Sequence, residues 1–242
     1  MRIGLVLFFA GWATSVEGAP TIDFAGGTIN LGTKITLNVT TTLARDTLMV
    51  ILYSHDSTFT GVDADSGVVP GGFTRRSTVA GGLEVWTGFA PTAFTNVGIN
   101  GYLAASAGAS IAVLAFNGIY DATLPFFDAN GALPVTAGPN STTGQHVQIT
   151  TTNTDNILVY ACGTKGPFAN IDNPTGWTSQ AYTNYAEADL RVSTLIVNSA
   201  QTNLDVNPST SDAHETVSMG DAVNGSLGPS GVGIIHAPLT HW

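Results

Sequence analysis

The stretch that decides the fold is Ile35-Thr-Leu-Asn-Val-Thr-Thr-Thr-Leu-Ala-Arg-Asp-Thr-Leu-Met-Val50. Thr and β-branched residues favour strands, and Asp46 is placed to cap a turn between a Thr-rich strand and an apolar strand. The same order returns in Val147-Gln-Ile-Thr-Thr-Thr-Asn-Thr-Asp-Asn-Ile-Leu-Val159. Aligning Val39 with Ile149 also aligns Leu48 with Leu158, each pair 110 positions apart. The sequence therefore predicts an internal duplication.

A second element repeats in both halves, after a loop of variable length. Pro70-Gly-Gly-Phe-Thr74 is echoed 104 positions later by Pro174-Thr-Gly-Trp-Thr178. Pro and Gly set a tight turn, and the aromatic residue that follows is delivered onto the sheet. We expect Phe73 and Trp177 to be matched core anchors, and the halves to close on similar apolar strands at 109–116 and 231–236.

The rest of the chain repeats the pattern of strands and turns. Short runs rich in Val, Ile, Thr, Phe and Tyr stand between clusters of Gly, Pro, Asn, Asp and Ser. The predicted strands are 3–13, 34–42, 46–54, 72–79, 82–89, 96–103, 109–117, 145–152, 155–163, 176–184, 188–198, 214–219 and 231–237.

The fold class predicted from these strands is all-β. We expect one jelly-roll-like antiparallel β-sandwich over residues 1–242, with pseudo-twofold halves at about 30–119 and 145–237. No Pro- or charge-rich linker separates the halves, which favours interleaved halves over two separate sandwiches. Interleaving would place a core strand of one half beside its counterpart in the other.

Composition limits the partners. Of the 242 residues, 43% are hydrophobic and only 10% are charged, so the chain lacks the composition of a disordered protein. Lys and Arg total 7 against 17 Asp and Glu, a net charge of −10. Nucleic acids and anionic membranes attract clustered positive charge, so neither is expected as a partner.

The N-terminus has two interpretations. Met1-Arg2 followed by the apolar residues 3–13 resembles a secretory signal that would be cleaved before Ala19. The same residues suit a buried first strand, which is the interpretation we favour. A run of 11 residues is too short to cross a bilayer as a helix, and no membrane span is predicted.

Two patterns resemble active-site patterns. Ser54-His55-Asp56 spells the letters of a hydrolytic triad, but adjacent strand residues point to opposite faces, and a triad is assembled across a fold. Glu84 and Glu187 occupy roughly corresponding places in the two halves, as a pair of glycosidase carboxylates would. Solvated strand faces explain both glutamates more simply, so the sequence predicts that the protein is not an enzyme.

Few residues have the pattern of a ligand site. Asp63-Ala-Asp65-Ser-Gly67 has the alternating carboxylates of a Ca²⁺ loop but lacks the downstream bidentate Glu, and an Asx-rich turn is the alternative. Asp63 and Asp65 are the metal candidates, and no other cofactor is predicted. Cys162, the single cysteine, is expected to be a small buried hydrophobe.

Aromatic side chains give a further candidate site. Exposed rings stack on the apolar faces of sugars, while neighbouring amides and carboxylates bind the hydroxyls. Trp86, Tyr120, Tyr182 and Tyr185 are the candidates for such a surface, and packing in the core or between subunits is the alternative.

The motifs resemble a β-sandwich family of phage virion and bacterial surface proteins. The matching pieces are Asp46-Thr-Leu-Met-Val50, Asn156-Ile-Leu-Val159, Pro174-Thr-Gly-Trp-Thr178 and Ala115-Phe-Asn-Gly-Ile119. The likeness covers nearly the whole chain. It departs from the pattern in the first half, where Gly72-Phe73 replaces Gly-Trp and an Asp-rich loop is inserted.

The resemblance implies a non-enzymatic structural protein of a virion, such as a capsid decoration, head fibre or tail appendage. Its expected location is the virion, and its expected partners are copies of itself or other virion proteins. The alternative is a secreted or surface carbohydrate-binding module with a cell-surface glycan as partner. A glycan hydrolase or lyase on a jelly roll is the third hypothesis, because fold does not determine function.

Overall fold

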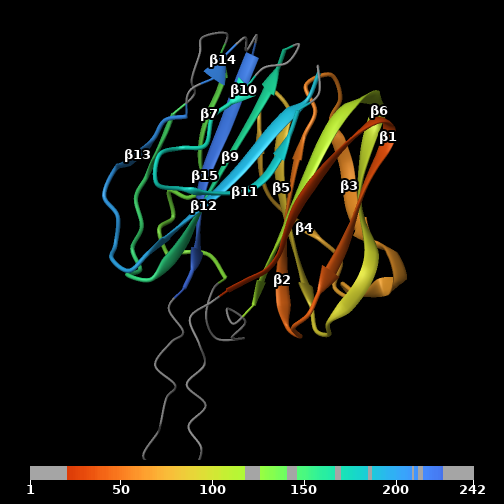
Figure 1. The fold of residues 1–242 in the computed structure, drawn as a ribbon, viewed down its shortest axis with the longest axis horizontal. Helices are drawn as coiled ribbons and strands as arrows, with labels where there is room; N and C mark the ends of the chain where they lie inside the picture. Colours follow the sequence, from red (N-terminus) through yellow and green to blue (C-terminus); the bar gives the residue numbers. More distant parts are fainter. Residues whose placement is uncertain are drawn as a thin grey trace, which may run out of the picture.

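The computed structural model describes residues 21–117, 126–140, 146–166, 170–184, 187–208, 210–211 and 215–225. Most of these residues lie in antiparallel strands joined by turns and loops, which confirms the predicted all-β sandwich (Figure 1). One short 3₁₀ turn, η1 (Asp65–Gly67), interrupts them. The strands are β1 (Thr21–Thr41), β2 (Asp46–Tyr53), β3 (Phe59–Ala64), β4 (Thr74–Val79), β5 (Leu83–Ala90), β6 (Phe94–Asn117), β7 (Val135–Asn140), β8 (Val147–Ile149), β9 (Asn156–Lys165), β10 (Asn170–Ile171), β11 (Thr178–Thr183), β12 (Asp189–Val197), β13 (Leu204–Val206), β14 (Thr210–Ser211) and β15 (Glu215–Asn224).

Two main sheets form the sandwich, one from each half of the chain. The first has the strand order β1-β6-β2-β5-β4, with β3 also paired to β6, and the second has the order β11-β12-β9-β15-β7. Figure 1 shows the two sheets packed face to face, with the first half in red to yellow and the second in green to blue. Two short pairs, β10-β14 and β8-β13, complete the described strands.

The two sheets correspond strand for strand. Reading the second sheet from β7 to β11 gives the same connectivity as reading the first from β1 to β4. Leu48 of β2 lies between Gly88 and Ala115, and Leu158 of β9 occupies the same register position in the second sheet. This correspondence supports the predicted duplication, which stays a prediction about the origin of the chain.

An irregularity is also shared between the sheets. The ladder between β4 and β5 skips one residue between Arg75 and Ser77. The ladder between β11 and β12 skips one residue between Ser179 and Ala181, the equivalent place at the same offset of 104. A β-bulge is a specific local feature, so its recurrence fixes the register of the two halves against each other.

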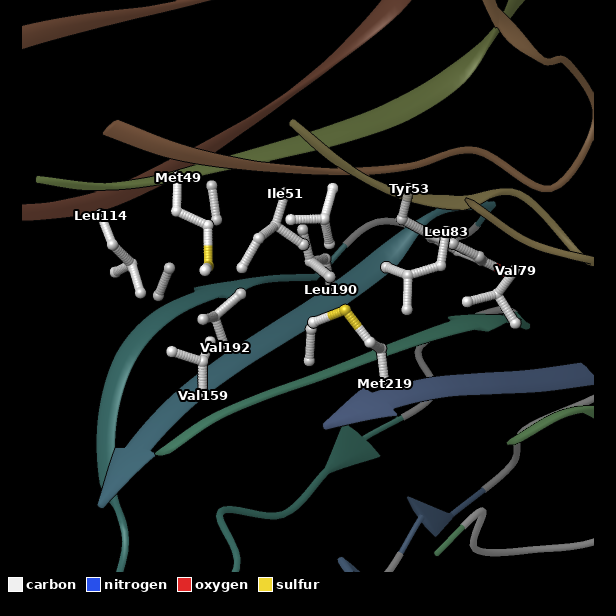
Figure 2. Packing of buried hydrophobic residues seen from close by; sticks show 14 of the residues in the cluster. Met49, Ile51, Tyr53, Val79, Leu83, Leu114, Val159, Leu190, Val192 and Met219 are labelled. Carbon is white, nitrogen blue, oxygen red and sulfur yellow. The ribbon is translucent and has the colours of Figure 1, made fainter. Parts of the chain in front are cut away.

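The central core lies between the sheets. Along β2, Met49, Ile51 and Tyr53 point toward the second sheet, because successive side chains of a strand alternate between faces. Figure 2 shows these side chains packed against Val159, Val192 and Met219 of the opposite sheet, with Leu83 and Val79 beside Tyr53. Burial of this apolar surface is the main force holding the sheets together.

Each sheet also carries an apolar cluster on its outer face. In the first half, β1 and β6 are long enough to bend over that face, so Ile35 and Val39 cover Leu48. In the second half, the separate strands β8 and β13 cover Leu158 in the same way. The β8-β13 register reproduces the outer part of the β1-β6 register at offsets of 110 and 107.

The arrangement of the two halves differs from the one expected. The halves are not interleaved, because β2 pairs with β5 and β6 while β9 pairs with β12 and β15. The strand equivalent to 109–116 is β15 rather than 231–236, since β15 pairs with β9 as β6 pairs with β2. Residues 3–13 and 231–237 lie outside the described residues.

Candidate functional site

A polar and charged cluster joins the two sheets at the ends of the interior strands β2, β9 and β15. His55 follows β2, and its Nε2 lies 2.7 Å from Glu215 Oε2 at the start of β15. The Nδ1 atom of His55 lies 2.7 Å from Asp56 Oδ1 and 3.0 Å from Lys165 Nζ at the end of β9. Lys165 also donates to Asp56 at 2.8 Å, and these hydrogen bonds lower the pKa of Asp56 below 3.8. The cluster is an electrostatic tie between sheets.

The Ser54-His55-Asp56 sequence does not form a nucleophile–base pair. Ser54 is buried, and its hydroxyl donates to the carbonyl of Gly108 at 2.8 Å. The equivalent hydroxyl in the second half, Thr164, donates to the carbonyl of Glu215 at 2.9 Å. The two hydroxyls therefore perform the same structural task in the two sheets.

The candidate Ca²⁺ carboxylates do lie together. Asn100 donates from its amide to Asp63 Oδ1 at 2.8 Å and to Asp65 Oδ1 at 3.0 Å. The Tyr102 hydroxyl donates to the second oxygen of Asp63 at 3.0 Å. Neutral donors thus bind these oxygens, and across the described residues no three His, Cys, Asp or Glu side chains are grouped to hold a metal ion. The Ca²⁺ site stays a prediction.

An ion pair with a fully buried carboxylate crosses from the edge strand β4 of the first sheet to the interior strand β15 of the second. Arg76, the bulge residue of β4, donates from Nε to Asp221 Oδ2 at 3.2 Å and from an Nη to Oδ1 at 3.3 Å. The guanidinium also donates to the carbonyl of Leu133 and lies 3.9 Å from the ring centre of Phe127. Burial raises the pKa of Asp221, and Arg76 opposes that shift. Sequence reasoning missed this pair.

The two glutamates considered as a catalytic pair have different surroundings. Glu84 is buried on the outer side of β5, where it accepts a hydrogen bond of 3.0 Å from the Trp86 indole and lies 3.8 Å from Arg75. Burial raises the pKa of Glu84. Glu187 is exposed just before β12. The residue that corresponds to Glu84 by register is Arg191, which pairs with Tyr182 as Glu84 pairs with Thr78.

Cys162 lies in β9 on the outer side of the second sheet. Its side chain is fully buried in the apolar cluster there, beside Tyr160. Burial raises the pKa of the Cys162 thiol to about 12. A thiol in this setting is a poor nucleophile, because the thiolate is the reactive form.

The predicted aromatic anchors occupy equivalent places on the outer faces. Each ring follows a Gly in the left-handed region, Gly72 with φ 69° and Gly176 with φ 85°, where a side chain would be strained. Phe73 packs over Gly88 in the first outer cluster. Trp177 is buried in the second, where its ring and the Tyr160 ring lie edge to face with their centres 6.3 Å apart.

Tyr182 forms the centre of an exposed polar cluster on the outer face of β11 and β12. The Arg191 guanidinium lies 4.1 Å from the centre of the Tyr182 ring. The Tyr182 hydroxyl donates to Asn170 at 3.1 Å and accepts from Asn184 at 2.8 Å. Of the other sugar-stacking candidates, Trp86 is half-buried beside Glu84, while Tyr120 and Tyr185 lie outside the described residues.

Comparisons with protein families, curated proteins and solved structures found no similar protein. Among the helices that the described ranges contain, none has the length and apolarity needed to cross a membrane.

Proposed function

We propose that this chain is a non-enzymatic structural subunit of a virion, such as a capsid decoration, a head fibre or a tail appendage. The observation that carries the proposal is that charged side chains connect the two sheets within the fold. Arg76 and Asp221 join the sheets at one place, and Lys165 and Asp56 join them at another. In both places a charged side chain of one half binds a charged side chain of the other. Such contacts suit a structural subunit that has to stay rigid.

Carboxylates also fix the loops. Asp23 accepts hydrogen bonds from the backbone of Thr42 and Leu43, and so holds the turn between β1 and β2. Asp128 accepts from the backbone of Thr152 and Asn153, at the equivalent turn before β9. Loops held in this way present a fixed surface to a neighbouring subunit, and a fixed surface loses less entropy on association.

The surface composition favours packing against other subunits. Only 10% of the residues are charged, so a contact between copies would bury hydroxyls, amides and backbone more than ions. The chain is therefore proposed to act as a homo-oligomer or together with other virion proteins.

The test is to locate the chain in virus particles purified on a density gradient from the host that carries its gene. Peptide mass spectrometry is expected to find the chain in the particle fraction at a fixed ratio to the major capsid protein. Antibody labelling would then place it on the head, fibre or tail. Recovery of the chain only as a monomer in the host cytosol, with none in the particles, would overturn the proposal.

A further inference from the structure

We propose that the exposed face of Tyr182 is a binding site for a neutral oligosaccharide. The site lies at the edge of the second sheet, where β11 and β12 place Tyr182 directly opposite Arg191. This inference does not depend on the proposed virion role, because a surface part and a secreted protein would use the same site.

The ring is held in a fixed orientation. Arg191 packs 4.1 Å from the ring centre, and its own guanidinium is fixed by hydrogen bonds to the Ile171 carbonyl and, at 2.9 Å, to Ser179. The Tyr182 hydroxyl is fixed by Asn170 and Asn184. A rigid ring loses little conformational entropy when a ligand stacks on it, and preorganisation of this kind favours binding.

The ring is exposed although it makes these contacts. Tyr182 is one of the few large apolar or aromatic side chains of the described chain with more than a third of its surface exposed, at 37%. Asn170, Ser179 and Asn184 around it are exposed as well. An aromatic ring beside amides and a hydroxyl matches a pyranose, which has an apolar C–H face and hydroxyls at its rim.

Charge selects a neutral ligand. The protein carries a net charge of −10, so an acidic polysaccharide is repelled at long range. Arg191, the cation nearest the ring, already binds Ile171, Ser179 and the Tyr182 ring. A carboxylate of an acidic ligand would have to compete with these contacts for the guanidinium.

The first half of the chain supplies a matched control. Thr78 occupies the position in β4 that Tyr182 occupies in β11, and it pairs with Glu84 as Tyr182 pairs with Arg191. Thr78 is exposed on an edge strand, so Thr78→Ala changes an equivalent surface without touching the ring. Tyr182→Phe keeps the ring and removes only the hydroxyl.

The experiment is a titration of the full chain, labelled with ¹⁵N, with maltohexaose, cellohexaose and mannohexaose, and with hexagalacturonate as the acidic probe. At least one neutral probe at about 10 mM is expected to shift the backbone signals of Asn170, Tyr182 and Arg191. Tyr182→Ala is expected to weaken that binding at least about tenfold, while Thr78→Ala and Tyr182→Phe keep it within about threefold.

Three results would overturn the inference. The first is the absence of shifts with every neutral probe. The second is binding that Tyr182→Ala leaves unchanged while its spectrum shows a folded protein. The third is preferential binding of hexagalacturonate, which would contradict the neutral class of ligand. Particle localisation is measured separately, so failure here leaves the proposed virion role standing and failure there leaves this site standing.

Discussion

The ring of Tyr53 lies directly against the backbone of Gly163, and the two residues occupy the same position in the two sheets. They are 110 positions apart, as Leu48 and Leu158 are. A Cβ atom on Gly163 would lie 2.4 Å from Cδ2 of Tyr53. One half therefore supplies a large side chain and the other half supplies the space for it. The fully buried Tyr53 fills the centre of the core by departing from the symmetry of the sheets.

Gly163→Ala is expected to destabilise the protein by about 1–3 kcal/mol, because the new methyl group overlaps a ring that is packed on every side. The measurement is urea unfolding followed by circular dichroism. Gly131→Ala is the control, since a Cβ there meets no atom within 4 Å, and it is expected to change the free energy of unfolding by less than about 0.5 kcal/mol.

A double-mutant cycle separates this contact from a general effect of Gly163→Ala. Tyr53→Ala alone leaves a cavity and is expected to cost about 3–5 kcal/mol. In the double variant the added methyl no longer meets the ring, so the two costs should fall short of additivity by at least about 1 kcal/mol. Strict additivity would show that Tyr53 and Gly163 do not contact each other.

Arg76→Met is expected to destabilise the protein by about 3–5 kcal/mol at pH 7, because it leaves the Asp221 carboxylate buried without its cation. Arg75→Met is the matched control. Its side chain is half exposed and 3.8 Å from Glu84, so the cost should stay below about 1 kcal/mol. Combining Arg76→Met with Asp221→Leu should recover most of the loss, and equal costs for Arg75→Met and Arg76→Met would refute the role of the pair.

The stability of the protein is expected to depend on pH through Asp46. Burial raises the pKa of Asp46, and Oδ2 of this side chain has no hydrogen-bond partner. A carboxyl with a raised pKa favours folding in its protonated form. Its contribution is thus complete below the ordinary pKa of 3.8 and is lost as pH rises through the pKa of the folded protein. Asp46→Asn should therefore raise the melting temperature at pH 7 and leave it nearly unchanged at about pH 4.

The second half of the chain allows the reverse substitution, from Asn to Asp, at the equivalent position. Asn156 is the residue equivalent to Asp46, and its buried Oδ1 also has no hydrogen-bond partner. Asn156→Asp should lower the melting temperature at pH 7 and recover part of the loss as pH falls. A gain of stability from Asn156→Asp at neutral pH would contradict this account of the two positions.

Cys162 is expected to resist thiol reagents in the folded protein. With a pKa of about 12, roughly one thiol in 10,000 is ionised at pH 8, and the side chain is also shielded from solvent. Ellman's reagent should release less than about a tenth of an equivalent from the native protein and a full equivalent in guanidinium chloride. Rapid stoichiometric labelling of the native protein would show that Cys162 is accessible.

Local sequence patterns were sufficient to predict most strands of the two main sheets. The run around Leu48 and its echo around Leu158 predicted β2 and β9 to within two residues at each end, because alternation and turn residues act over short distances. The bend of β1 and β6 over the outer face was missed. β1 was expected only over 34–42, and β6 was expected as two strands, 96–103 and 109–117. The shift in register between Gly32 and Lys34, opposite Ala107 and Tyr102, is where each long strand departs from a regular alternation.

The contacts between the two halves could not be predicted from local sequence patterns. Arg76 and Asp221 are 145 positions apart, and His55 and Glu215 are 160 apart. Nothing near Arg76 in the sequence indicates an anion, so only the packing of the sheets brings the pair together. For Tyr182 the ring was identified as a candidate, whereas its partner Arg191 follows from the β11-β12 register alone.

The two corresponding sheets form one cooperative unit, because they share the core that lies between them. Trp86 packs against the outer cluster of the first sheet and Trp177 lies in that of the second. Two variants, each retaining one of these tryptophans with the chain's other three replaced by Phe, report the unfolding of each sheet by fluorescence. We predict that both signals and the circular dichroism at 218 nm change at one urea concentration. Separate midpoints for Trp86 and Trp177 would contradict the shared core.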